Sequence, residues 1–385
     1  MKDCGANIIV NLVPPTAGGG LQNAVSLVMG IAGNETLRRQ SIIVCPAGGP
    51  VHLACKENDM NVAPVRAGLT GRILFEFGGG IRIARRHGAK TVFTLFGNAP
   101  LVSPGLYRIS GFALSNILTP EIDFWQDLPP SRRFLKKLKD VIRLWLARRS
   151  DEIIVETEFL GQRARTGPFR DRIVHVVKME PSAAVLKALT NRPRNDRRGR
   201  LRLLALTGPH PNKRLTAMAP IMARLAALRS RRGGTLPEFV ISIDETHPHA
   251  KSVAAAFEAA GAPPPRFLGK IAPSDVAAQL QAVDGIVNIA RLESFSNNWV
   301  EAWAAGLPLI STDADWARAS CGEAAIYVDP EQPEQAAERI YTVFSSPEKL
   351  AALALAGDRQ LLELGALGSK IERYAQVLMR TAERS

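Results

Sequence analysis

Two glutamates with seven residues between them mark the stretch of this sequence that is best equipped for chemistry. Glu293 and Glu301 enclose the heptapeptide Ser-Phe-Ser-Asn-Asn-Trp-Val. An apolar run of strand length, residues 284–290, precedes them, and Gly306-Leu-Pro after them is typical of a helix end. Glu293 is therefore predicted to lie in a loop just past a strand, and Glu301 inside the helix that follows.

This placement suits a ligand that carries both phosphates and sugar hydroxyls. In a parallel α/β sheet, the loop and the helix start lie at the carboxyl edge of the strands, where ligands bind. The free N–H groups of the helix start, around Ser296 to Asn298, favour a phosphate. One carboxylate then lies beside the phosphate, and the other about one helical turn deeper.

A second loop supplies a cation. Residues 201–207 form a predicted strand, the loop Gly208-Pro-His-Pro-Asn-Lys-Arg214 follows, and residues 215–228 have helical character. The loop ends in two basic residues, Lys213 and Arg214, directly before the predicted helix. The alternative is that Lys213 is a solvated surface lysine.

The motif around the two glutamates resembles the signature of retaining glycosyltransferases of family 4. Glu-x7-Glu is followed by Ala-x-Ala-x-Gly-x-Pro, and Cys321-Gly-Glu-Ala-Ala-Ile-Tyr-Val-Asp-Pro330 resembles the next block of that family. The resemblance covers most of residues 150–340, is weak in the N-terminal part, and is to bacterial polysaccharide and lipopolysaccharide glycosyltransferases. It implies the α/β GT-B fold, with two Rossmann-like α/β/α domains and a cleft between them. It also implies transfer of a sugar from a nucleotide-diphosphate sugar to an acceptor hydroxyl, without a metal or a cofactor.

The resemblance assigns roles to residues of this chain. Glu293 and Lys213 are the catalytic candidates, with Glu293 contacting the donor sugar and Lys213 the diphosphate, while Glu301 binds the ribose hydroxyls. The remaining donor-binding candidates are Phe295, Ser296, Asn297, Asn298, Thr207, Arg214, Ile271, Gly19 and Gly20.

Five of these assignments depend on the surroundings of the residue. Thr207 stands where the family often has an arginine, which leaves the diphosphate with one cation fewer unless Arg214 or another basic residue substitutes. The backbone near Ile271 is expected to meet the nucleobase. Gly19 and Gly20 belong to a glycine loop, residues 16–21, whose alternative interpretation is a tight turn without a ligand.

The acceptor side is less well defined by the sequence. Gly97 and Asn98, which follow a predicted strand at residues 91–96, are candidates for it, and ordinary turns are the alternative. The histidine that many family members place in the cleft is not evident. Ser294-Phe-Ser296 replaces the commoner Gly-Phe-Gly, which indicates a changed sugar-binding surface.

Composition and turn residues suggest two domains. Residues 1–189 are the predicted acceptor-binding domain, the basic and turn-rich segment 190–200 a linker, and 201–368 the nucleotide-sugar-binding domain. By analogy with the family, a last helix within 369–385 crosses back to the N-terminal domain.

The charge of the chain implies an anionic partner. The net charge is +13, which fits nucleic acid, an anionic membrane surface or phosphorylated ligands. Residues 131–149 form a predicted basic amphipathic helix whose stripe comprises Phe134, Leu138, Val141 and Trp145. We expect this helix to contact anionic lipid, although its stripe may instead pack on the sheet of its own domain.

Several functional classes are less favoured. The four cysteines show no zinc spacing and are those of a reduced cytosolic protein, and no run is long enough to cross a bilayer. The expected location is therefore cytoplasmic, peripheral on the inner face of the membrane, with a lipid-linked or saccharide acceptor. Asp313-Ala-Asp315 is expected to be a helix cap or surface feature.

Two rival functions remain open from the sequence. A sugar-nucleotide epimerase on the same fold would need acid–base residues in the cleft that are not found. A basic nucleic-acid-binding protein is suggested by charge alone, without a recognised module. Nucleic acid is accordingly not expected as a partner.

Overall fold

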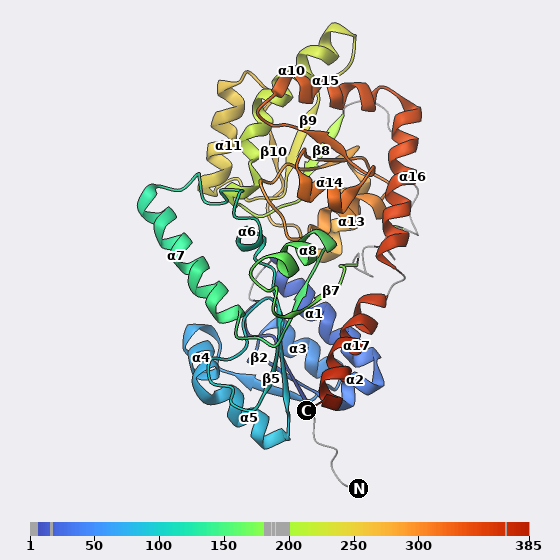
Figure 1. Cartoon of the computed structure of the whole chain (residues 1–385). Coiled ribbons are helices and arrows are strands. Elements are labelled where there is room, and N and C mark those ends of the chain that lie inside the picture. Colours follow the sequence, from blue (N-terminus) through green and yellow to red (C-terminus); the bar gives the residue numbers. More distant parts are fainter. Residues whose placement is uncertain are drawn as a thin grey trace. The chain divides into compact units, whose positions relative to one another are not determined.

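The computed structural model describes residues 7–15, 18–180, 186, 189, 201–365 and 368–384. It divides into two compact units, Met1–Lys178 with Ala366–Ser385, and Met179–Gly365. Each unit contains a parallel sheet with flanking helices, which confirms the predicted α/β architecture of two Rossmann-like parts (Figure 1). The predicted linker 190–200 lies outside the described residues.

The sheet of the first unit has seven strands in the order β3-β2-β1-β4-β5-β6-β7. Every strand pairs with its neighbours in parallel. The strands are β1 (Ile8–Asn11), β2 (Ser41–Pro46), β3 (Val62–Val65), β4 (Thr91–Thr94), β5 (Tyr107–Gly111), β6 (Glu152–Val155) and β7 (Ile173–Val176).

Helices connect these strands and cover both faces of the sheet. They are α1 (Gly18–Gly33), α2 (Glu35–Gln40), α3 (Pro50–Glu57), α4 (Gly68–Leu74), the π-helical η1 (Phe75–Gly79), α5 (Gly80–His87), α6 (Ser115–Leu118), α7 (Pro130–Ala147), α8 (Glu158–Thr166) and α17 (Ser369–Arg384). One apolar core packs α1, α3 and α17 against the sheet, and Tyr374, Val377 and Leu378 bring α17 into it. A second core on the sheet contains Phe75 of η1 and Ala84 of α5.

The sheet of the second unit has six strands in the order β10-β9-β8-β11-β12-β13, again all parallel. The strands are β8 (Arg202–Ala205), β9 (Glu238–Ile241), β10 (Arg266–Phe267), β11 (Gly285–Asn288), β12 (Leu309–Thr312) and β13 (Ile326–Val328). The order reverses between β8 and β11, and a ligand is expected at such a reversal.

The helical elements of this unit include two short 3₁₀ turns, η2 and η3, directly after β8. In full they are η2 (Pro211–Lys213), η3 (Leu215–Ala217), α10 (Met218–Arg231), α11 (Pro248–Ala259), η4 (Pro273–Asp275), α12 (Val276–Gln281), α13 (Asn297–Ala304), α14 (Asp315–Cys321), α15 (Pro333–Phe344) and α16 (Pro347–Leu364). None of the described helices is long and apolar enough to cross a membrane.

The glycine loop at residues 16–21 is shorter than predicted. Helix α1 begins at Gly18, so Gly19 and Gly20 lie in its first turn rather than in a loop, and residues 16–17 are outside the described part of the chain. Of Gly18, Gly19 and Gly20, only Gly18 has a positive φ, 59°, a conformation that glycine adopts more readily than other residues do. Glycines in a first helical turn are compatible with a helix because the chain there has only just left the loop.

Helix α7 does not pack its apolar stripe on the sheet of its own unit. The side chains of Phe134, Leu138, Val141 and Trp145 are all exposed. The inward side is formed by Ala147 and by Asp140, the buried residues of this helix. Asp140 accepts hydrogen bonds from Asn116 Nδ2 at 2.7 Å and Trp125 Nε1 at 2.6 Å. A polar network thus holds α7, and its apolar side faces outward.

Candidate active site

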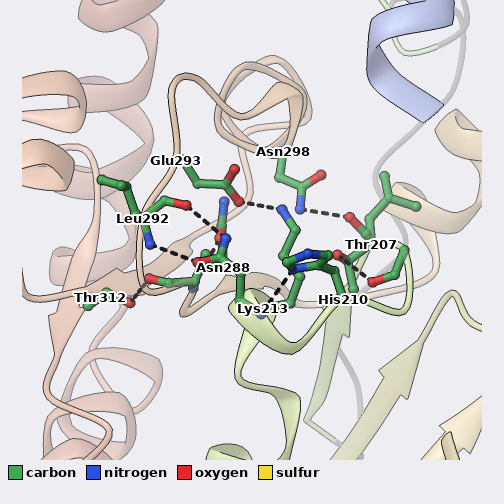
Figure 2. Close-up of polar contacts among 12 residues, drawn as sticks. Thr207, His210, Lys213, Asn288, Leu292, Glu293, Asn298 and Thr312 are labelled. Atoms are coloured by element: carbon green, nitrogen blue, oxygen red, sulfur yellow. Dashed lines mark hydrogen bonds and ion pairs between the residues drawn. The ribbon is translucent and has the colours of Figure 1, made fainter. Parts of the chain in front are cut away.

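The candidate site is built at the carboxyl edge of β8 and β11. These strands pair in parallel, with Gly285 opposite Leu203, so the loops that follow them lie side by side. The first loop carries Lys213 and the second carries Glu293. The Lys213 ammonium forms an ion pair with Oε1 of Glu293, although the two residues are 80 positions apart (Figure 2).

Asn212 fastens the two loops together through backbone groups. Its Nδ2 donates to the Leu292 carbonyl at 2.8 Å, and its Oδ1 accepts from the Leu292 N–H at 3.2 Å. The Arg291 N–H also donates to the Asn212 carbonyl at 2.8 Å. Asn212 is buried, and the sequence analysis did not single it out. Its position next to Lys213 is the only indication of it that the sequence holds.

The start of α13 is where a ligand's phosphate is expected. Ser296 is the N-cap, and its side chain makes no capping hydrogen bond among the described residues. The first N–H groups of the helix, from Asn297 and Asn298 onward, therefore have no capping oxygen from Ser296. The Asn298 amide donates to the Leu206 carbonyl at 2.8 Å, which joins α13 to the end of β8. Phe295 packs edge-to-face on Trp299, with the ring centroids 5.2 Å apart.

Glu301 lies one turn further along α13 and is buried, with 8% of its surface exposed. Its Oε2 has no hydrogen-bond partner within the described part of the chain. Burial raises the pKa of this carboxyl from its ordinary value of 4.5 to about 7. A buried carboxylate oxygen without a donor is suited to accept hydrogen bonds from ligand hydroxyls.

A small cavity separates the two loops from the strands beneath. Thr207, Lys213, Asn288 and Asn298 supply its polar lining, and its volume of about 10 Å³ has room for about one water molecule. The Nδ2 of Asn288 is buried and has no partner among the described residues. Figure 2 shows Asn288, Thr207 and Asn298 around the Lys213 side chain.

The other predicted residues lie further from this ion pair. The Arg214 guanidinium pairs with Glu331, which follows β13, and its backbone has a φ of 51°. Ile271 lies between β10 and η4, past the carboxyl end of β10. The structure therefore brings Lys213, Glu293, Thr207 and Asn298 together, whereas Arg214 is directed to a different partner.

The remaining candidates belong to the first unit. Gly97 is packed closely, because a Cβ there would lie 2.8 Å from Cγ of Pro14. This close approach gives Gly97 a structural reason, and Asn98 follows it as a half-buried residue. Gly19 and Gly20 lie at the start of α1, which also belongs to the first unit.

Asp313 and Asp315 are both exposed, so the Asp313-Ala-Asp315 motif is a surface feature and not a helix cap. The N-cap of α14 is Ala314, and the Asp313 carboxylate accepts from the Arg318 guanidinium at 2.5 and 2.8 Å. This pair lowers the pKa of Asp313. Among the described residues, no group of three or more His, Cys, Asp or Glu side chains is arranged to hold a metal ion.

Comparison with known proteins shows that the part of the chain that carries this site matches a known family. Residues 204–346, which include both loops of the site, match the family model of glycosyl transferases group 1. The matched segment is a glycosyltransferase domain of that group. The chain is therefore a glycosyltransferase, and the Lys213–Glu293 pair lies inside the matched segment. A search of curated proteins gave no match.

Solved structures of glycosyltransferases share the fold along nearly the whole chain. A glycosyltransferase from Rickettsia africae superimposes with a TM-score of 0.71, at 15% identity over 98% of this chain and 99% of that one. HepE from Anabaena, in complex with UDP-glucose, gives a TM-score of 0.67, at 14% identity over 97% and 99%. WaaG, described as a glycosyltransferase involved in lipopolysaccharide biosynthesis, gives 0.68, at 16% identity over 96% and 99%. These similarities confirm the GT-B fold.

Proposed function

We propose that this glycosyltransferase moves a sugar from a nucleoside-diphosphate sugar to an acceptor hydroxyl with retention of the anomeric configuration. The observation that carries the proposal is the site at the β8–β11 edge. There, Lys213 and the α13 N-terminus offer positive charge and N–H groups to a diphosphate, while the buried Glu301 offers an acceptor oxygen to hydroxyls. HepE, which has the same fold, was solved with UDP-glucose, and this supports a nucleotide-sugar donor.

The roles of the residues follow from the charge that develops during transfer. The bond between the anomeric carbon and the diphosphate oxygen breaks, the acceptor hydroxyl oxygen forms the new bond to that carbon, and the hydroxyl proton passes to the leaving diphosphate. Negative charge grows on the leaving diphosphate, where Lys213 and the α13 N–H groups stabilise it. Glu301 holds the ribose, and Glu293 exchanges its pairing with Lys213 for contacts to the donor sugar. No metal has a part in this proposal.

Binding measurements test the donor site. Calorimetric titration with UDP, GDP and ADP should give tight binding to one of them that changes little between 50 and 300 mM salt. Glu301→Ala should abolish that binding. Glu334→Ala, which removes an exposed carboxylate on α15, is the matched control and should leave it intact.

Product analysis then separates the candidate functions. Incubation with a panel of nucleotide sugars should release free sugar slowly, and NMR should show that the anomeric configuration is kept. Inversion would overturn the retaining mechanism, and conversion of the donor into an epimer would favour the sugar-nucleotide epimerase. Binding only to RNA, with a steep salt dependence, would replace the donor site with a nucleic-acid site.

We also propose that the chain is peripheral on the cytoplasmic face of a membrane and acts on a lipid-linked or saccharide acceptor in envelope polysaccharide or glycolipid synthesis. The support is α7, where eight lysines and arginines between residues 132 and 149 accompany the exposed apolar stripe. WaaG, a structural relative, is described as involved in lipopolysaccharide biosynthesis.

Flotation tests the membrane contact. The protein should float with phosphatidylglycerol vesicles and remain at the bottom of the gradient with phosphatidylcholine vesicles. Replacement of Phe134 and Val141 by serine should reduce flotation. If the wild-type protein does not float with either lipid, the proposed location is wrong.

A further inference from the structure

A second exposed apolar surface lies on the first unit, in the segment that joins β3 to β4. Leu69, Ile73 and Leu74 of α4 and Phe77 of η1 are 73%, 47%, 62% and 65% exposed. We refer to these four side chains as the α4–η1 patch. Large apolar side chains so exposed and so close together in one short segment mark a contact surface.

The local backbone is built to present this patch. The helix is kinked at Phe77 and Gly78, and Gly78 has a φ of 145°, a value that side chains rarely adopt. Gly71 allows a close approach, because a Cβ there would lie 1.6 Å from the Arg66 carbonyl oxygen. Replacing either glycine would therefore disturb the segment, so its shape is specified by the sequence.

The segment is also anchored on its inner side. Phe75 is 1% exposed and belongs to an apolar core of the first unit. The Glu76 carboxylate accepts from the Leu101 N–H at 3.2 Å, and its carbonyl accepts from the Val102 N–H at 3.0 Å. Phe75 and Glu76 thus point inward, while their neighbours Leu74 and Phe77 remain outside.

The charge around the patch is strongly positive. The exposed arginines of the segment are Arg66, Arg72, Arg82, Arg85 and Arg86. The acidic residue among positions 66–90 is Glu76, whose side chain is 16% exposed and which is held by the Leu101 backbone. An apolar patch with a cationic border matches a bilayer that contains anionic lipid. A second copy of this chain would bring two such borders together and is disfavoured by repulsion.

The α4–η1 patch and α7 cover the same face of the seven-stranded sheet. Both segments connect strands in the same direction across the sheet, and right-handed connections place them on one face. The strand register agrees, because Val92 packs in the core of η1 while Ile153 packs with Ala147 at the end of α7. Val92 and Ile153 lie on the same face through the partners Arg108 and Ser110.

Hydrogen bonds join the two surfaces. Arg149, just after α7, donates to the Leu101 carbonyl at 3.1 Å, and Leu101 in turn donates to Glu76. Val102, the residue after Leu101, has 39% of its surface exposed. The exposed apolar side chains of α7 and of α4–η1 are therefore parts of one face.

We propose that the α4–η1 patch is a second lipid-contacting site, which together with α7 fixes the first unit on an anionic bilayer at two places. This inference rests on the proposed membrane association through α7. Two separated contacts restrict the rotation of the unit about α7, whereas a single helix would allow it. Apolar side chains enter the interfacial region, and the bordering arginines face the lipid phosphates.

Vesicle partitioning of paired variants tests the second contact. Leu74→Ser with Phe77→Ser should weaken binding to phosphatidylglycerol vesicles by at least about tenfold, since two apolar side chains lose their burial in lipid. The matched control is Leu355→Ser with Leu362→Ser, which removes two exposed leucines from α16 of the second unit and should have no effect. Hydrolysis of the nucleotide sugar without vesicles should be unchanged in both variants, so failure of this inference is distinguishable from failure of the donor site.

A second measurement locates the patch directly. Phe77→Cys in a Cys4→Ser background can carry an environment-sensitive fluorophore, because Cys45, Cys55 and Cys321 are buried. Its emission should shift to the blue with phosphatidylglycerol vesicles and not with phosphatidylcholine. Unchanged partitioning of the serine variant together with unshifted emission would overturn the proposal. A concentration-dependent dimer that the serine variant abolishes would also overturn it, by assigning the patch to a second copy.

Discussion

Replacing Glu301 by glutamine should stabilise the second unit at alkaline pH and have little effect at acid pH. The carboxyl loses its proton near 4.5 in the unfolded chain, whereas burial raises its pKa to about 7 in the folded one. Between these values the folded state binds more protons, so the free energy of unfolding falls as the pH rises. At about 1.4 kcal/mol for each pH unit, the ionised carboxylate costs the fold about 3 kcal/mol above pH 7.

Glutamine cannot ionise, so Glu301→Gln should remove this cost. At pH 8 the variant should be more stable than the wild type by up to about 3 kcal/mol, and at pH 4.5 the difference should disappear. Urea unfolding at several pH values measures this, with the fluorescence of Trp299, Trp303 and Trp316 reporting on the second unit. Glu334→Gln is the control, because water solvates that exposed carboxylate in both states.

The same substitution should weaken nucleotide binding, because an ionised carboxylate accepts hydroxyl hydrogen bonds more strongly than an amide oxygen does. A loss of about tenfold or more in affinity is expected from the strength of such bonds. Higher stability with lower affinity would show that burial of Glu301 serves the ligand at the expense of the fold. A stability difference that is equal at pH 5 and pH 8 would refute the reasoning.

Three further substitutions test other parts of the structure. Lys213→Ala should lower the turnover of donor hydrolysis about 10²–10³-fold, with partial recovery in Lys213→Arg. A loss below about threefold would show that Lys213 does not stabilise the leaving diphosphate. Asn212→Ala leaves the Leu292 backbone groups without their partners and should lower the free energy of unfolding, measured in urea, by about 1–3 kcal/mol. Asp140→Ala removes the buried acceptor of the Trp125 hydrogen bond and should therefore lower the melting temperature of the first unit in calorimetry. Donor hydrolysis should stay unchanged.

The sequence could predict which loops carry the donor site because the motif identifies each residue within its own strand–loop–helix unit. Glu293 lies past β11 and Glu301 within α13, as their spacing predicts. Direct pairing of Glu293 with Lys213 depends on the strand order, since β8 and β11 are neighbours although β9 and β10 lie between them in the sequence. No local pattern encodes that order. Resemblance to a family was needed to place the two loops together.

Asn212 shows what local patterns leave out. A side-chain amide can donate and accept at once, so one asparagine can satisfy both the N–H and the carbonyl of Leu292. Nothing near Asn212 in the sequence indicates that a backbone 80 positions away needs it. The prediction of a glycine loop at residues 16–21 was wrong for a related reason. Three consecutive glycines favour a turn locally, yet helix α1 extends back to Gly18.

For helix α7 the sequence predicts the helix and its apolar side, but not whether that side faces the core or the solvent. A stripe of apolar residues at helical spacing predicts a helix and one of its faces, and in most soluble domains that face is turned to the core. Here Asp140 decides the orientation. Its buried carboxylate accepts hydrogen bonds from two half-buried donors, Asn116 and Trp125, and a charge so placed requires the inward position more strongly than the exposed stripe does. The apolar side is then left for an external partner. The eight basic residues around it, together with the exposed stripe, are the reason why we propose an anionic membrane as its partner.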